Sequence, residues 1–214
     1  MTSKQLSRRD FLKLSGLALG GAALTFSGLG YAAALPPKIA TPEFSFAKES
    51  AMTQKILIPY ATRAGSTAEI AAAIGQTLAE RGFSVDVKPV KKASSPAGYQ
   101  AVILGSAIRM GSWLPEMVKF IQANQAALNG LPAALFTVHM LNTGDDEASR
   151  AARAAYTAPV RALLPNAPEA FFTGLMDFSR LSFLDRFIAN MVKAVESDQR
   201  DWEKIRAWAM TVLE

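Results

Sequence analysis

Hydrophobic positions follow two alternating patterns beyond residue 54. Short apolar runs rich in valine and isoleucine are typical of buried strands, and segments with apolar residues three or four positions apart are typical of helices. The strand pattern occurs at 56–58, 84–88, 99–105, 131–138 and 167–175. The helix pattern occurs in the segment that ends at residue 82, then at 113–128, 147–164 and 201–213. Two details add to this picture: the alternation at 84–88 predicts a half-exposed strand, and Pro159 must begin, kink or interrupt the third helix.

Strands that alternate with helices of this length predict an α/β fold with a doubly wound, five-stranded parallel sheet. In such sheets ligands bind beyond the carboxyl ends of the strands. Three loops follow the first, third and fourth predicted strands, so all three are expected to meet at that edge.

The first of these loops is predicted to bind an anion. It joins the first strand to the first helix and consists of Thr62, Arg63, Ala64, Gly65, Ser66 and Thr67. Amide groups at a helix start have no partners within the helix and attract negative charge, and the hydroxyl groups add further donors. Gly65 lets the backbone close around a ligand. A phosphate group is therefore the expected guest, although the same residues could serve only as helix caps.

The other two loops complete the predicted cofactor-binding set. The second loop comprises Ser106, Ala107, Ile108, Arg109, Met110 and Gly111. The third begins at the end of the fourth strand with His139, Met140 and Leu141. No catalytic residue is identified, and no metal site is predicted.

Two common phosphate motifs are missing from the chain. The sequence has no G-x-x-x-x-G-K-[ST] run, which disfavours a nucleotide triphosphatase because the required lysine is absent. It also has no G-x-G-x-x-G after a strand, which argues against a dinucleotide site. A monophosphate remains.

The pattern Thr-x-x-Gly-x-Thr at 62–67 resembles the phosphate loop of flavodoxins. That resemblance implies FMN as cofactor and the strand order 2-1-3-4-5. More narrowly, the segments 60–63 and 105–111 resemble the FMN loops of the menaquinone-dependent protoporphyrinogen dehydrogenase family. The inserted amphipathic helix predicted at 178–196, before the last helix, and the Asp201-Trp202-Glu203 opening of that helix also match the family.

The resemblance implies an FMN-binding oxidoreductase that passes electrons to a quinone, with a tetrapyrrole as donor. Backbone groups of residues 106–111 would contact the flavin ring. A flavodoxin-type electron carrier that meets a redox partner protein, without a small-molecule substrate of its own, is the main alternative. A flavin-free interaction domain is the third.

Several side chains are compatible with two roles. Arg109 would balance an anionic reduced flavin or meet a carboxylated substrate, or else be solvated. Trp113 would flank the ring or start a core helix. His139, the only histidine, would transfer protons or simply be satisfied within its loop. The segment 178–196 would pack on the sheet edge, or meet a quinone, a tetrapyrrole or a membrane surface.

Composition narrows the function classes. The formal net charge is +5, but residues 1–34 contribute four bases and one acid, which leaves about +2 for the remainder. That charge is too small and too dispersed to predict a nucleic-acid partner. The chain has no cysteine, which excludes disulfides, thiolate chemistry, iron–sulfur clusters and a lipoprotein anchor.

The amino-terminal segment is predicted to be a twin-arginine signal peptide at 1–34. Arg8 and Arg9 lie in the pattern Ser-Arg-Arg-Asp-Phe-Leu-Lys, followed by a moderately apolar stretch and small residues at 32–34. Residues 35–54 are predicted to be a linker, and residues 55–214 the flavodoxin-like domain. The expected location is the periplasm or the outer face of the membrane, with membrane association if the leader stays attached.

Overall fold

The computed structural model describes residues 39–47, 54–191 and 194–213. The predicted signal peptide at 1–34 lies outside these residues. Five parallel strands form the centre of the main sheet in the order β3-β2-β4-β6-β7, so the predicted order 2-1-3-4-5 is confirmed. These strands are β2 (Lys55–Ala61), β3 (Ser84–Pro89), β4 (Ala101–Arg109), β6 (Ala133–His139) and β7 (Glu169–Thr173).

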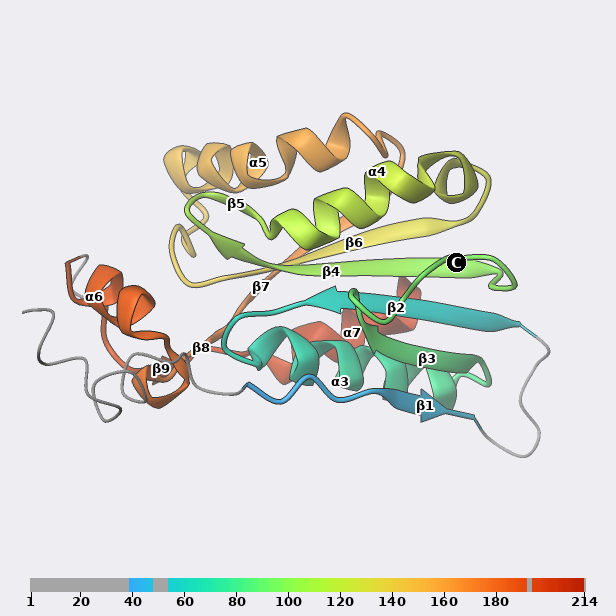
Figure 1. Cartoon of the computed structure of the whole chain (residues 1–214), viewed down its shortest axis with the longest axis horizontal. Coiled ribbons are helices and arrows are strands. Elements are labelled where there is room, and N and C mark those ends of the chain that lie inside the picture. Colours follow the sequence, from blue (N-terminus) through green and yellow to red (C-terminus); the bar gives the residue numbers. More distant parts are fainter. Residues whose placement is uncertain (1–38, 48–53, 192–193, 214) are drawn as a thin grey trace, which may run out of the picture.

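Helices cover both faces of this sheet (Figure 1). One layer contains α3 (Ser66–Glu80) and α7 (Trp202–Thr211), and the other contains α4 (Pro115–Asn129) and α5 (Glu147–Arg161). Successive side chains of a strand point to opposite faces, so Ile56 and Ile58 pack in the core under α3 while Leu57 packs in the core under α4. Burial on both faces explains the nearly continuous apolar runs of the central strands.

Part of the predicted linker belongs to the sheet, so the linker prediction for 35–54 is wrong at this point. Residues Phe44–Phe46 form strand β1, which pairs antiparallel with β3. The Ser45 hydroxyl donates to Asp86 Oδ1 at 2.8 Å, and the Tyr60 hydroxyl donates to the carbonyl of Pro42 at 2.7 Å. Because β1 occupies the sheet edge, β3 is mostly buried, and the half-exposed prediction for it is also wrong.

Three element boundaries differ from the predicted ones for physical reasons. Strand β4 runs on to Arg109 because it turns back into a short hairpin with β5 (Ser112–Trp113). Helix α4 therefore begins only at Pro115, where proline needs no amide partner. Helix α5 continues through Pro159 to Arg161 and begins at the Asp146 cap.

The segment before the last helix is more elaborate than a single amphipathic helix. It contains β8 (Leu175–Met176), the 3₁₀ turn η1 (Phe178–Arg180), α6 (Phe183–Met191) and β9 (Ser197–Asp198). Strands β8 and β9 pair with each other, apart from the main sheet. The whole segment, called the insertion below, lies beyond the carboxyl ends of the strands (Figure 1). No helix among the described residues is both long and apolar enough to cross a membrane.

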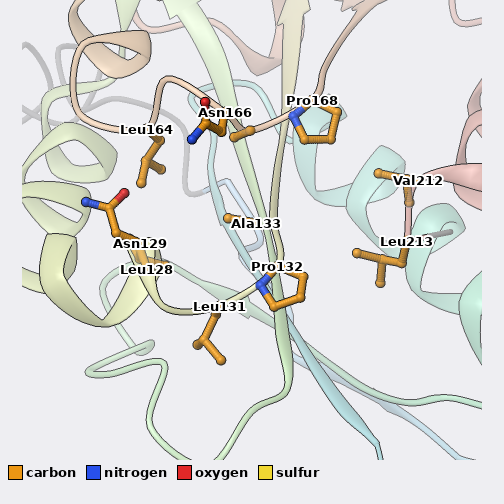
Figure 2. Close-up of a pocket in the computed structure, with 11 residues that line it drawn as sticks. Leu128, Asn129, Leu131, Pro132, Ala133, Leu164, Asn166, Pro168, Val212 and Leu213 are labelled. Atoms are coloured by element: carbon orange, nitrogen blue, oxygen red, sulfur yellow. The ribbon is translucent and has the colours of Figure 1, made fainter.

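A hollow of about 420 Å³ opens at the opposite end of the sheet, before the first residues of β6 and β7 (Figure 2). Its walls are leucine, asparagine, proline, alanine and valine side chains, including Leu131, Pro168 and Val212. None of these can titrate or carry charge. The loops that the sequence singles out lie at the carboxyl ends instead.

Close packing at Gly105 generates the first prediction. A Cβ atom there would lie 1.9 Å from Cζ of the fully buried Phe136 on the neighbouring strand. We expect Gly105→Ala to destabilise the fold by roughly 1–3 kcal/mol in urea unfolding, because the ring cannot move without a new cavity or clash. Gly130→Ala is the control, since its Cβ would meet no atom closer than 3.6 Å. Equal stability of the two variants would contradict the packing argument.

Candidate functional site

The three predicted loops enclose one cavity of about 410 Å³ at the carboxyl ends of β2, β4 and β6. Twelve of the fifteen predicted cofactor-binding residues line it: Thr62, Arg63, Ala64, Ser66, Ala107, Ile108, Arg109, Met110, Gly111, His139, Met140 and Leu141. The volume is within the range of small-molecule sites. The structure thus brings the three loops together, and the binding roles of their residues stay a prediction.

The other three predicted residues support the cavity from behind. Gly65 has φ 90° and forms the turn into α3, a conformation that favours glycine. The Ser106 hydroxyl is fully buried, accepts the amide of Leu114 at 3.0 Å and donates to the carbonyl of Ala107 at 2.9 Å. Thr67 is fully buried at the start of α3.

The start of α3 offers hydrogen-bond donors that its own cap does not satisfy. Its Gly65 N-cap provides no side-chain cap, and the Gly65 amide itself donates to Oγ1 of Thr62 at 2.9 Å. Among the described residues, Oγ1 of Thr67 is a buried hydroxyl oxygen without a hydrogen-bond partner. An unpaired buried polar group is costly, and an anion at this helix start would offer acceptors to such donors. These residues therefore fit a phosphate group.

The remaining walls of the cavity are largely apolar. Ile108 and Met110 contribute from the β4 hairpin, and Leu175 and Met176 contribute from the insertion. A polar, donor-rich end next to apolar walls suits a ligand with a flat ring and a phosphate tail. The chain's own residues are thus compatible with a flavin mononucleotide.

Both arginines of the predicted loops are held by carboxylates. The guanidinium of Arg63 makes a bidentate pair with Glu116, in which Nη2 lies 2.9 Å from Oε2, and this hydrogen bonding lowers the pKa of Glu116. Arg109 Nε donates to Asp185 of α6 at 2.9 Å. Arg109 is therefore paired although its side chain is partly exposed, and its contact attaches the insertion to the cavity.

Trp113 belongs to the core rather than to the cavity wall. Its side chain is buried among the residues under α4, and Nε1 donates to Oγ1 of Thr137 at 2.8 Å. The structure therefore shows Trp113 as a core residue, placed in β5 just before α4, and not as a residue that flanks a ring in the cavity.

Nine cavity-lining residues were not predicted from the sequence: Val138, Tyr156, Gly174, Leu175, Met176, Leu181, Asp185, Ala189 and Ala194. Seven of the nine lie at or beyond the end of β7, in the insertion or the glycine that precedes it. Their only signal was the position of that segment before the last helix. Within the described residues, no group of three or more His, Asp or Glu side chains could hold a metal ion.

A family model for the flavodoxin domain matches residues 57–203. The chain belongs to the flavodoxin domain family. Family membership implies flavin binding, and the carboxyl-end cavity is where this flavodoxin domain offers room for it.

Two curated relatives share one description. Protoporphyrinogen IX dehydrogenase (quinone) of Escherichia coli strain K12 is 26% identical over 174 residues, covering 74% of this chain and 94% of the relative. The protein of that description from Leishmania major is also 26% identical over 174 residues, covering 75% of each. Among solved structures, the rubredoxin oxygen:oxidoreductase of Desulfovibrio gigas has a TM-score of 0.50 at 15% identity, over 77% of this chain and 36% of that chain. The structural likeness shows the fold alone.

His139 lies in the wall of the flavodoxin cavity as a buried ring. Its Nδ1 is 2.8 Å from the carbonyl of Leu141, and the rings of Tyr156 and Phe171 pack around it. Burial lowers its pKa below the ordinary value of 6.5 despite that hydrogen bond, and the charges of Arg153 and Lys204 lower it further. His139 is therefore both satisfied within its loop and placed at the cavity.

This lowered pKa predicts a pH dependence of stability. Because the unfolded chain binds a proton near pH 6.5 and the folded chain resists it, folding should weaken as the pH falls below that value. We expect the free energy of unfolding of His139→Gln to change less between pH 6.5 and pH 5 than that of the wild-type protein. Urea titration at each pH measures it. Desolvation raises the pKa of the partly buried Glu169, which makes the folded state more stable as the pH falls. This effect is present in the wild-type protein and in the variant, so it cancels when their pH profiles are compared. Parallel profiles would show that His139 is not the titrating group.

Proposed function

We propose that this protein is an FMN-dependent oxidoreductase that passes electrons from a reduced organic donor to a quinone. The observation that carries the proposal is the convergence of three loops on one cavity, with an uncapped helix start at one side and apolar walls at the other. Membership in the flavodoxin domain family supports the flavin, and the resemblance of residues 62–67 to a flavodoxin phosphate loop supports a monophosphate.

The residues would divide the work between the two ends of the cofactor. Thr62, Ser66 and Thr67, with the first amides of α3, would hold the phosphate. Backbone groups of residues 107–111 and 139–141 would contact the ring and tune its reduction potential through hydrogen bonds. Bound FMN would supply reversible electron transfer. The apolar walls from the insertion would exclude water from the ring.

The donor and acceptor are proposed from the relatives and from the surface. The relatives' description names protoporphyrinogen IX and a quinone, so we propose a tetrapyrrole donor and a quinone acceptor here. Large apolar side chains that are more than half exposed surround the cavity or cover the insertion: Met110, Leu141, Phe183, Phe187, Met191 and Val195. Exposed apolar side chains near a cavity are typical of a site for a lipophilic partner. It supports access to a quinone at a membrane surface.

We also propose that the protein acts outside the cytoplasm, after twin-arginine export. The support is the leader pattern of residues 1–34. An exported protein would still reach quinones in the membrane. The same apolar patch would also suit docking of a redox partner protein, which keeps an electron carrier without its own substrate as the second proposed function.

The flavin is tested first. Purified, folded protein should show a visible flavin absorption spectrum, or acquire one when FMN is added. Anaerobic protoporphyrinogen should then bleach this spectrum, and a menaquinone analogue should restore it. A folded protein that takes up no FMN would overturn the proposal. Bleaching only by a reduced partner protein would favour the electron carrier.

The apolar patch makes a separate prediction about the acceptor. Phe183 and Phe187 are 75% and 55% exposed on α6, so polar replacements should not disturb the fold. We expect the double variant Phe183→Ser, Phe187→Ser to raise KM several-fold for a long-chain quinone in vesicles, and to leave KM for a short-chain quinone unchanged. Met210→Ser is the control, since Met210 is an exposed apolar residue on α7. Equal effects on both quinones would contradict a docking role.

A further inference from the structure

A second cavity adjoins the flavin cavity at His139. It has a volume of about 520 Å³ and lies along the edge strand β7, next to α5 and the start of α7. His139 lines both cavities, and Arg153, Phe171 and Lys204 line the second one. His139 is thus the wall that the two cavities share, and a molecule held in the second cavity would lie next to the first.

The cations of the second cavity lie next to an aromatic ring. The guanidinium of Arg153 is 5.9 Å from the centre of the Phe171 ring, and it donates to the carbonyls of Asn142 and Gly144 at 2.6 Å each. Only 12% of the Arg153 side chain is exposed, so it is held in one place. Its charge and that of Lys204 are both close enough to His139 to help burial lower the pKa of that ring.

The carboxylates around this cavity are already occupied or exposed to water. Asp145 is fully exposed and 3.8 Å from Arg153, and Asp201 accepts the backbone amide of Lys204 at 2.9 Å as the cap of α7. Glu169 accepts from the Thr157 hydroxyl at 3.2 Å and lies 3.8 Å from the guanidinium of Arg161. Among the described residues, the Lys204 ammonium group has no hydrogen-bond or ion-pair partner. It is the cation available to a ligand.

We propose that the second cavity binds a carboxylate of the organic electron donor, with Lys204 as its ion-pair partner and Phe171 against the apolar body next to it. An ammonium group and a buried guanidinium beside an aromatic ring favour an anionic group carried on a flat or apolar molecule. The inference rests on the proposed function, and it names the residues that would recognise the electron donor. A quinone has no carboxylate, so the second cavity would select the donor and not the acceptor.

The test compares two porphyrins that differ only in their carboxylates. Protoporphyrin IX carries two carboxylates, and its dimethyl ester carries none. Their affinities for the purified full chain are measured by porphyrin fluorescence in a neutral detergent. We expect the wild-type protein to bind the diacid about tenfold more tightly than the diester, because one charged hydrogen bond contributes about that much. The preference should weaken as salt is added.

Lys204→Gln should remove most of this preference, because it should weaken binding of the diacid and leave binding of the diester unchanged. Lys204 is exposed, so the variant should fold normally. Arg206→Gln is the matched control, because Arg206 is an exposed cation on the same helix that does not line the cavity. It should behave as the wild type.

Two results would overturn the inference. One is equal affinity of the wild-type protein for diacid and diester, and the other is an equal loss of diacid binding in Lys204→Gln and Arg206→Gln. The flavin spectrum separates this failure from that of the proposed function. If the protein binds FMN and oxidises its donor but does not distinguish the two porphyrins, only the proposed carboxylate site is contradicted.

Discussion

The parallel register of β2, β4 and β6 is the constraint on which the rest of the structure depends. Their last residues are paired side by side, as Ala61 with Ser106 and Ala107 with Val138. Helices bury both faces of these strands, so a slip by one residue would exchange the side chains packed under α3 with those packed under α4 and disrupt both cores. The three loops are consequently held at one edge of the sheet. The cavity is the space that this edge leaves between them.

The insertion closes this space through ion pairs rather than through a continuous core. Glu69, in the first turn of α3, receives Arg180 of η1 at 2.7 Å and also Arg200, which follows β9. Burial opposes ionisation of Glu69, but the two arginines outweigh it and lower its pKa. Arg109 holds α6 in the same way through Asp185. Large apolar side chains of α6, Phe183, Phe187 and Met191, are thereby left exposed to solvent.

The site residues that were predicted lie in a recognisable local sequence pattern, and those that were missed do not. Small and hydroxyl residues directly after a buried strand are visible in the sequence, and Thr62 and Ser66 were identified in that way. Tyr156 lies on an ordinary helix and Lys204 on another, and nothing next to either marks it as part of a cavity. The strand at 44–46 was missed because three residues are too few for a period, and only pairing with β3 makes them a strand.

The sequence by itself determined the order of strands and helices, the edge at which a ligand would lie and the nature of the first loop. These depend on the spacing of apolar residues and on local backbone chemistry, which neighbouring residues settle among themselves. Only the tertiary structure decided which partners hold Arg109 and Glu69, that Trp113 faces the core, and that His139 separates two cavities. Those contacts join residues as far apart as Arg109 and Asp185, 76 positions along the chain, and Glu69 and Arg180, 111 positions along it. No local pattern records such a pairing, because it exists only once the sheet has brought the segments together.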